Sequence, residues 1–329
     1  MTEPVISVSN LRKRFNLEAG FFAPLGRYVY AVNGVSFDIG KNETYGLVGE
    51  SGCGKTTTAR LLVRMYEADE GNIFFHGQNA AENSIEASDK IQDVRKLKGK
   101  DYKRYREKVK YVFQDPARSL NPRMTVYEVL TSGAKWSSEK RYDKTSTLKD
   151  EAASLLEEVG LSAKDLERRP AEFSGGQRQR ISIARGLLMN PDILICDEVV
   201  SALDVSIQGQ ILNLLLDLRS RRKISFLFIA HDLKVASYFC DRIGVMYRGE
   251  IMEEAPATSL WGNHLHPYTE LLFSSAKAGS ASKGEITSAT QAAEGCAFVS
   301  RCPKAEEICF KKKPGVREAG TAHFLRCHK

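Results

Sequence analysis

The chain has 329 residues, of which 42% are hydrophobic and 27% charged, and its formal net charge is +7 at pH 7. This length and apolar content exceed what one compact domain usually uses, so we expect one main domain with an appendage. No run approaches the ~18 consecutive apolar residues of a bilayer-spanning helix, and the first residues lack a basic region followed by an apolar core. The sequence therefore predicts a soluble protein that is not secreted.

In the first half of the chain the hydrophobic pattern predicts several strands and two helical segments. The predicted strands are Ile6–Val8, Val32–Ile39, Thr44–Val48, Gly71–Phe75 and Tyr111–Phe113. The run Thr44–Val48 is apolar without alternation, which is typical of a strand buried on both faces of a parallel sheet. A helix is predicted at Thr56–Met65, and Lys90–Lys110, with ten Lys or Arg against three acids, indicates an exposed helical insertion.

The second half alternates helices and strands and then changes character. Helices are predicted at Lys149–Val159, Gln177–Leu188 and Gln208–Arg219, and buried strands at Ile193–Cys196 and Ile224–Ala230. A hairpin over Arg242–Glu254 is expected to turn at Arg248–Gly249. Residues 274–295 are rich in Ala, Ser, Gly and Thr, which indicates a flexible linker. Together these elements predict an α/β fold with crossover helices, followed by a separate C-terminal unit.

Residues 49–56 read Gly-Glu-Ser-Gly-Cys-Gly-Lys-Thr, after one predicted buried strand and before a predicted helix. This is the G-x-x-x-x-G-K-[ST] pattern in the context that the pattern requires. Glycines let backbone N–H groups approach phosphates closely, Lys55 reaches the β- and γ-phosphates, and the Thr56 hydroxyl binds Mg²⁺. The segment predicts a nucleoside triphosphate site.

Two further segments carry chemistry suited to such a site. The strand Ile193–Cys196 ends in Asp197, which would hold the Mg²⁺ shell, and Glu198, which would polarise the attacking water. The segment Ser174–Gln177, with two adjacent glycines, opens a predicted helix and offers backbone N–H groups to an anion.

This order of motifs resembles the nucleotide-binding subunit of ATP-binding-cassette (ABC) transporters over roughly Val5 to Ala255. The resemblance implies a P-loop NTPase cassette with a mixed core sheet, an antiparallel β subdomain at its edge and a helical signature subdomain. It also implies that Ser174–Gln177 contacts the γ-phosphate bound by an opposite subunit, so that two ATP molecules lie between two cassettes in a head-to-tail dimer.

The resemblance also assigns roles to single residues. Gln114 would contact both Mg²⁺ and the membrane partner, Asp204 belongs to a segment that communicates between the two sites, and His231 would bond the γ-phosphate. Phe15 is the expected adenine-stacking aromatic, with Tyr28 and Tyr30 as alternatives. The expected catalytic residues are Lys55, Glu198 and His231, and the expected Mg²⁺ ligands are Thr56, Gln114 and Asp197. The expected nucleotide contacts are Phe15, Gly49, Ser51, Gly52, Cys53, Gly54, Lys55, Thr56, Thr57, Gln114, Ser174, Gly175, Gly176, Gln177 and Asp204.

Later stretches narrow the resemblance to the oligopeptide/dipeptide importer branch, whose members also carry nickel, glutathione and some sugar conjugates. These stretches are residues 117–123, 264–269, 295–298 and 301–303. The expected division is a nucleotide-binding domain over 1–255 and a C-terminal extension over 256–329, with the linker at 274–295 and a four-cysteine module at 296–329.

Four of the seven cysteines lie in the last 34 residues, namely Cys296, Cys302, Cys309 and Cys327. Spacings of five, six and seventeen residues are too wide for the knuckle of a structural zinc finger. Four thiolates can hold a [4Fe-4S] cluster, and relatives with the same four cysteines are thought to bind one. Zinc, with His323 or His328 as a substitute ligand, and free or disulfide-paired thiols remain alternatives. We expect any cluster to be structural, although a redox-sensing role is also compatible with the sequence.

The expected function is an ATPase subunit that powers import of peptides or a related small solute from the cytoplasmic face of the inner or plasma membrane. Expected partners are a second ATPase subunit, by analogy a related chain rather than a second copy, two membrane permeases and an external substrate-binding protein. The alternative is a soluble ABC-type ATPase acting on nucleic acid or the ribosome, for which the basic run Lys90–Lys110 is the only support. An iron–sulfur sensor with vestigial nucleotide binding is disfavoured because Glu198 and His231 are both present.

Overall fold

A computed structural model describes residues 3–16, 28–77, 92–137, 145–277 and 294–329. The chain folds into two compact units. Unit 1 comprises residues 1–5, 40–42 and 75–227, and unit 2 comprises residues 6–39, 43–74 and 228–329. Among the described helices, none is long and apolar enough to cross a bilayer.

Unit 1 is built on parallel strands that carry helices. Its elements are β5 (Gln92–Asp93), α2 (Gly99–Lys108), β6 (Val109–Val112), α3 (Pro116–Ser119), α4 (Val126–Thr131), α5 (Thr145–Glu158), α6 (Gly175–Leu187), β7 (Ile193–Asp197), α7 (Val205–Arg222) and the start of β8 (Ser225–Ala230). Short 3-10 turns occur at η1 (Val94–Lys96), η2 (Ala134–Trp136), η4 (Ala163–Glu167) and η5 (Pro170–Glu172). Strand β6 pairs with β7 in parallel, from Val109 opposite Ile193 to Val112 opposite Cys196.

Helix α6 lies close against these strands. A Cβ atom built on Gly186 would lie 2.9 Å from Leu194 Cδ1 and 3.5 Å from Val112 Cγ2. All five residues of β7 are buried, as expected for a strand covered on both faces. This packing holds the end of β7, where Asp197 and Glu198 follow, in a defined position.

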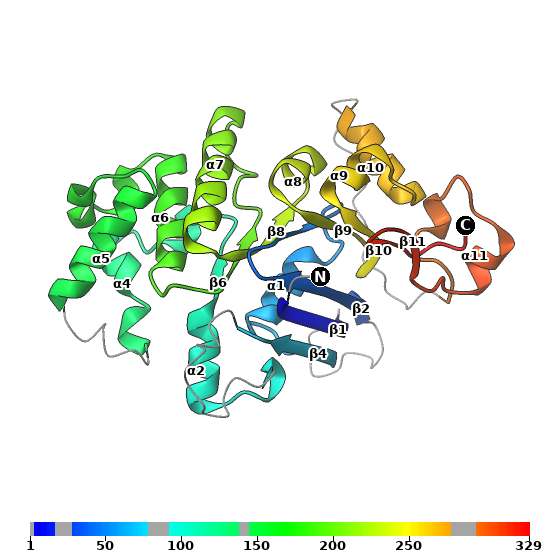
Figure 1. Cartoon of the computed structure of the whole chain (residues 1–329), viewed down its shortest axis with the longest axis horizontal. Helices are drawn as coiled ribbons and strands as arrows, with labels where there is room; N and C mark the ends of the chain where they lie inside the picture. Colours follow the sequence, from blue (N-terminus) through cyan, green and yellow to red (C-terminus); the bar gives the residue numbers. More distant parts are fainter. Residues whose placement is uncertain (1–2, 17–27, 78–91, 138–144, 278–293) are drawn as a thin grey trace. The chain divides into compact units, whose positions relative to one another are not determined.

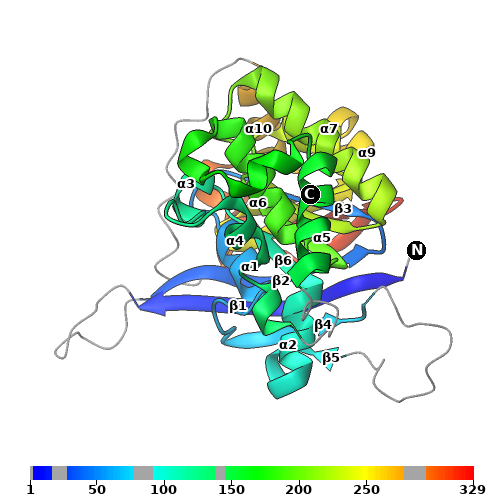
Figure 2. The ribbon, with the colours of Figure 1, turned by 90° about the vertical axis from the view of Figure 1, so that its left-hand side faces the viewer.

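Helices α4, α5 and α6 pack on one another through apolar side chains, at the left of Figure 1 and toward the viewer in Figure 2. The buried side chains include Val126, Leu130, Leu155, Leu156 and Ile183. This cluster corresponds to the helical signature subdomain that the sequence predicts. Of the predicted basic insertion, residues 94–96 form η1 and 99–108 form α2, while 90–91 lie outside the described residues.

Unit 2 contains strands of both sheets and the C-terminal helices. Its elements are β1 (Pro4–Asn16), β2 (Tyr28–Gly40), β3 (Thr44–Val48), α1 (Lys55–Leu62), β4 (Glu70–Phe75), α8 (Leu233–Phe239), β9 (Arg242–Tyr247), β10 (Glu250–Pro256), α9 (Ala257–Gly262), α10 (Pro267–Lys277), η6 (Val299–Arg301), α11 (Glu307–Lys311), β11 (Arg317–Gly320) and β12 (His323–Leu325). One sheet has the order β2-β1-β4 within this unit, and the other has the order β11-β12-β10-β9-β3.

The second sheet of unit 2 is mixed. Strand β3 pairs with β9 in parallel, and β9 pairs with β10 antiparallel. Between β9 and β10, Arg248 has a φ of 45° and Gly249 a φ of 82°. Two consecutive positive φ values are those of the tight turn that matches strand twist, so the predicted hairpin and its turn are confirmed.

The C-terminal region departs from the prediction of a separate unit behind a linker. Strand β12 pairs antiparallel with β10, so the tail extends the sheet of unit 2. Helix α10 continues to Lys277, so the first residues of the predicted linker are helical, and residues 278–293 lie outside the described part of the chain. The linker prediction failed at its start because small residues are as compatible with a helix end as with a coil.

Candidate functional site

The glycine-rich loop over residues 49–54 lies between β3 and α1 in unit 2, where the sequence predicts it. Helix α1 begins at Lys55, whose side chain turns back over the loop and is only 4% exposed as a residue. Its ammonium group donates to the carbonyl oxygens of Gly49 at 2.8 Å and Glu50 at 3.0 Å. Lys55 is therefore held at the mouth of a loop that opens a helix N-terminus, which is a phosphate-binding arrangement.

Two glycines in the loop meet neighbouring backbone directly. Gly49 has a φ of 150°, and a Cβ atom there would lie 2.2 Å from the carbonyl oxygen of Met246. Gly54 has a φ of 112°, and its Cβ would lie 2.1 Å from the carbonyl oxygen of Ala31. No side chain fits at either position, so both glycines are required by packing as well as by conformation.

The other loop residues differ in exposure. Ser51 and Gly52 are exposed at the tip, whereas Thr56 and Thr57 are half-buried in the first turn of α1. Cys53 is 1% exposed, and burial raises the pKa of its thiol. A buried protonated thiol is a poor nucleophile, so Cys53 acts as a small filler of the loop.

The paired acids lie at the end of β7 in unit 1. Asp197 is 3% exposed and accepts a hydrogen bond from the Tyr111 hydroxyl at 2.5 Å. Glu198 follows with a φ of 49° and accepts from the Gln114 amide, Nε2 to Oε2, at 2.9 Å. The structure thus brings Gln114 and Glu198, 84 residues apart, into contact. Sequence reasoning missed Tyr111, which it treated only as a strand residue.

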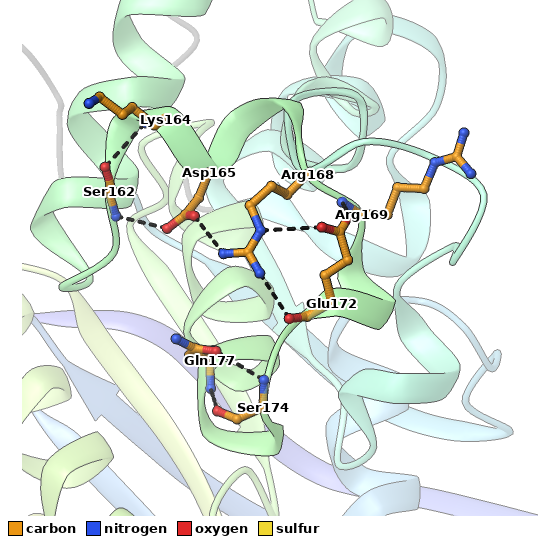
Figure 3. Close-up of polar contacts among 8 residues, drawn as sticks. All are labelled: Ser162, Lys164, Asp165, Arg168, Arg169, Glu172, Ser174 and Gln177. Atoms are coloured by element: carbon orange, nitrogen blue, oxygen red, sulfur yellow. Dashed lines mark hydrogen bonds and ion pairs between the residues drawn. The ribbon is translucent and has the colours of Figure 1, made fainter.

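Ser174 caps helix α6 in unit 1 by a reciprocal pair of hydrogen bonds (Figure 3). Its hydroxyl accepts from the Gln177 N–H at 3.3 Å, and its own N–H donates to the Gln177 side-chain oxygen at 3.0 Å. A Cβ on Gly176 would lie 2.7 Å from Ile207 Cγ2 of α7, so glycine allows the two helices to approach. The capping residues are the same Ser and Gln that the signature segment supplies.

Arg168 organises the turn that precedes Ser174 (Figure 3). Its guanidinium donates to Asp165 Oδ1 at 2.9 Å and to the Glu172 carbonyl oxygen at 3.0 Å. It also lies 4.3 Å from the centre of the Phe173 ring, which is 4% exposed. A cation over an aromatic face is an attractive contact. Sequence reasoning did not find Arg168, because single surface arginines carry no pattern.

The remaining predicted residues lie at element ends. Asp204 is exposed and precedes α7 in unit 1, and His231 is exposed directly after β8 in unit 2. Phe15 near the end of β1 packs edge-on against Tyr66, with ring centres 5.3 Å apart. Tyr28 begins β2 beneath the Arg14 guanidinium, 4.5 Å away. The aromatic that stacks on adenine therefore stays a prediction.

The four C-terminal cysteines all lie in unit 2. Cys296 and Cys309 are buried, and Cys302 and Cys327 are half-buried. Burial raises the pKa of the Cys296 thiol, and the three other thiols add to that rise. In the described part of the chain, no group of three or more His, Cys, Asp or Glu is arranged to hold a metal ion.

Comparison with known proteins identifies the family. The sequence model of the ABC transporter family matches residues 32–201. The chain is 42% identical to the oligopeptide transport ATP-binding protein AppF of Bacillus subtilis (strain 168), over 99% of this chain and 97% of that protein. The chain belongs to the ABC transporter family. A second family model, for the C-terminal region of oligopeptide/dipeptide transporters, matches residues 252–309 of this ABC protein.

Other relatives cover the same length. A putative peptide import ATP-binding protein of Brucella ovis is 40% identical over 99% of this chain and 98% of its own. Among solved structures, the ADP conformation of the cassette MJ1267 has a TM-score of 0.64 at 23% identity, covering 83% of this chain and 99% of that one. The dimeric cassette MJ0796 has a TM-score of 0.63 at 25% identity, covering 77% and 98%. The expected cassette fold is confirmed.

Replacing Ser174 with Ala should lower the free energy of unfolding by about 1 kcal/mol, because the first turn of α6 loses a cap. Thr125→Ala is the matched variant, since Thr125 caps α4 through the same reciprocal pair, with its hydroxyl 3.2 Å from the Glu128 N–H. Urea unfolding followed by circular dichroism measures both. A loss at Thr125 with none at Ser174 would contradict the cap.

Proposed function

We propose that this ABC protein binds and hydrolyses ATP to power the import of peptides or a related small solute. The observation that carries the proposal is the glycine-cradled Lys55 at the start of α1. Full-length similarity to oligopeptide and peptide import ATP-binding proteins supports the solute class. The match of residues 252–309 to the oligopeptide/dipeptide C-terminal region supports it independently.

Hydrolysis would proceed by attack of water in line with the γ-phosphate. Lys55 would neutralise charge on the β- and γ-phosphates, and Thr56 with Asp197 would hold Mg²⁺. The Tyr111 hydroxyl orients the Asp197 carboxylate, and the Gln114 amide orients that of Glu198. Glu198 would then accept a hydrogen bond from the attacking water, and His231 would bond the γ-phosphate.

The active form would be a pair of cassettes in which Ser174–Gln177 of each contacts the ATP of the other. The dimeric state of the cassette MJ0796 supports this assembly. We propose a related ATPase chain as the partner, two membrane permeases beneath the pair and an external binding protein that selects the solute. The protein would then sit peripherally on the cytoplasmic face of the membrane.

The nucleic-acid alternative is supported by the basic run Lys90–Lys110, part of which forms α2. Within α2, Lys103 and Lys108 each donate to a backbone carbonyl oxygen of the protein. Lysines engaged within the fold are less available to phosphate backbones. Peptide import is therefore the function that the observations favour.

For the cysteine tail we propose a structural [4Fe-4S] cluster held by Cys296, Cys302, Cys309 and Cys327. Support comes from the four cysteines lying together in unit 2, with Cys296 and Cys309 buried and Cys302 and Cys327 half-buried. A [4Fe-4S] cluster binds one thiolate at each iron, so four cysteines complete its ligands. When bound, it would cross-link a tail that is too small to build its own core.

Glu198→Gln should lower ATP turnover by roughly 100-fold or more while MgATP binding is kept, because the amide cannot polarise water but leaves the phosphate contacts in place. Phosphate release and equilibrium binding of a fluorescent ATP analogue measure the two effects. Turnover equal to that of the unchanged protein would exclude Glu198 as the base.

Ser174→Ala should also lower ATP turnover, by roughly tenfold or more, because the proposed hydroxyl contact with the partner's ATP would be lost. Thr125→Ala, with a comparable loss of stability, should keep its turnover. If both variants lose activity in parallel, the signature serine acts through folding alone.

Anaerobic purification should yield a brown protein that absorbs near ~400 nm and contains about four iron and four sulfide per chain. Substituting Cys309 with Ser should remove most of that absorption, since one iron loses its thiolate. A fully folded protein that contains zinc, or no metal, when prepared in this way would eliminate the cluster.

A further inference from the structure

The phosphate loop is held by the C-terminal extension through one ion pair. Glu50, the second residue of the loop, has a side chain only 2% exposed. Arg301 Nη1 lies 2.7 Å from its Oε2, and Arg301 Nη2 lies 2.9 Å from its Oε1. The two residues are 251 positions apart and both belong to unit 2. This bidentate pairing is the strong geometry for a guanidinium and a carboxylate.

A second contact from the extension holds the backbone of the same residue. The Glu50 N–H donates to the Tyr268 hydroxyl of α10 at 3.0 Å. Burial raises the pKa of Tyr268, so its hydroxyl keeps its proton. Side chain and main chain of Glu50 are therefore both fixed by residues outside the cassette motifs.

Arg301 is itself fixed by an aromatic platform. Its guanidinium lies 5.7 Å from the ring centre of Tyr247 and 5.8 Å from that of Phe298. Phe298 packs edge-on against Tyr247 at 5.2 Å and lies 5.3 Å from Tyr268. All three rings are at most 1% exposed. The platform holds the guanidinium in one orientation, so the pair with Glu50 loses little side-chain entropy.

The charge of Glu50 makes this pairing matter for nucleotide binding. Its backbone oxygen, with that of Gly49, accepts from the Lys55 ammonium. A Glu50 carboxylate released from Arg301 would be a buried, unpaired negative charge on the second residue of the loop, and it would disfavour a bound phosphate. Arg301 pairs with the Glu50 carboxylate and neutralises its charge.

We propose that Arg301 is a positioning residue for ATP, and that the C-terminal extension thereby sets the affinity of the phosphate loop for MgATP. This inference rests on the proposed function and deepens it. Arg301 lies on the segment between Cys296 and Cys302. It acts through Glu50 and does not contact the nucleotide.

The test compares Arg301→Gln with a matched control in the same extension. Lys313 pairs with Glu250 at 2.6 Å, and the exposure of the two basic side chains is nearly equal, 33% for Lys313 and 32% for Arg301. Glu250 is not a residue of the phosphate loop. Lys313→Gln therefore removes an ion pair of the same extension without releasing a charge into the loop, and Glu250 keeps Arg326 at 3.9 Å and Asn33 at 2.8 Å as partners.

With the full chain, Arg301→Gln should raise the Kd for MgATP and the KM for ATP by roughly tenfold or more, with kcat changed by less than about threefold. Lys313→Gln should leave all three values near those of the unchanged protein. Arg301→Lys, which keeps the charge but loses the bidentate contact, should be intermediate. The double variant Glu50→Gln/Arg301→Gln should recover most of the affinity for MgATP, because it leaves no unpaired buried charge on residue 50.

Equal Kd and KM values for Arg301→Gln and Lys313→Gln would overturn the inference, as would a double variant no better than Arg301→Gln. If Arg301→Gln does not fold, Arg301→Lys and the double variant carry the same comparison. Failure of the proposed function would give a different result. The unchanged protein would then bind no MgATP, and Glu198→Gln would have the same ATP turnover as the unchanged protein.

Discussion

The nucleotide site depends on the close passage of the phosphate loop against two neighbouring backbones. At Gly49 and Gly54, a Cβ atom would lie within 2.2 Å of a carbonyl oxygen, so only glycine allows the loop to lie where it does. That path decides where α1 begins and where the Lys55 side chain folds back. A loop displaced by a side chain at either position would lose the arrangement of N–H groups that phosphate binding requires.

The same loop is tied to the rest of unit 2 by hydrogen bonds. The N–H of Gly249, in the turn after β9, donates to the Cys53 carbonyl oxygen at 2.8 Å. The Asn33 N–H donates to the Gly249 carbonyl oxygen, also at 2.8 Å. With Tyr268 and Arg301 bound to Glu50, hydrogen bonds to the loop come from the β9–β10 turn and from the extension, and β2 bonds to that turn. The C-terminal residues Tyr268 and Arg301 are therefore part of the framework that holds the glycine-rich loop in unit 2.

In unit 1, the paired acids Asp197 and Glu198 each accept a hydrogen bond from a neighbour that chemistry alone would not single out. Tyr111 and Gln114 come from the strand beside β7 and the segment after it, so the parallel pairing of β6 with β7 brings them to Asp197 and Glu198. Carboxyl ends of parallel strands meet at one edge of a sheet, which is where such sites form. The capped start of α6 is likewise prepared within the unit by Ser174 and Gln177.

The sequence by itself determined the local features: the phosphate loop, the paired acids, the start of the signature helix and the β9–β10 turn. Each depends on residues a few positions apart, whose spacing and side-chain chemistry are visible in the chain. Only the tertiary structure decided that β12 joins β10, that Tyr111 reaches Asp197 and that Arg301 pairs with Glu50. A lone arginine, tyrosine or glutamate has no periodic signal, and its partner is selected by how strands and helices pack across long stretches of chain.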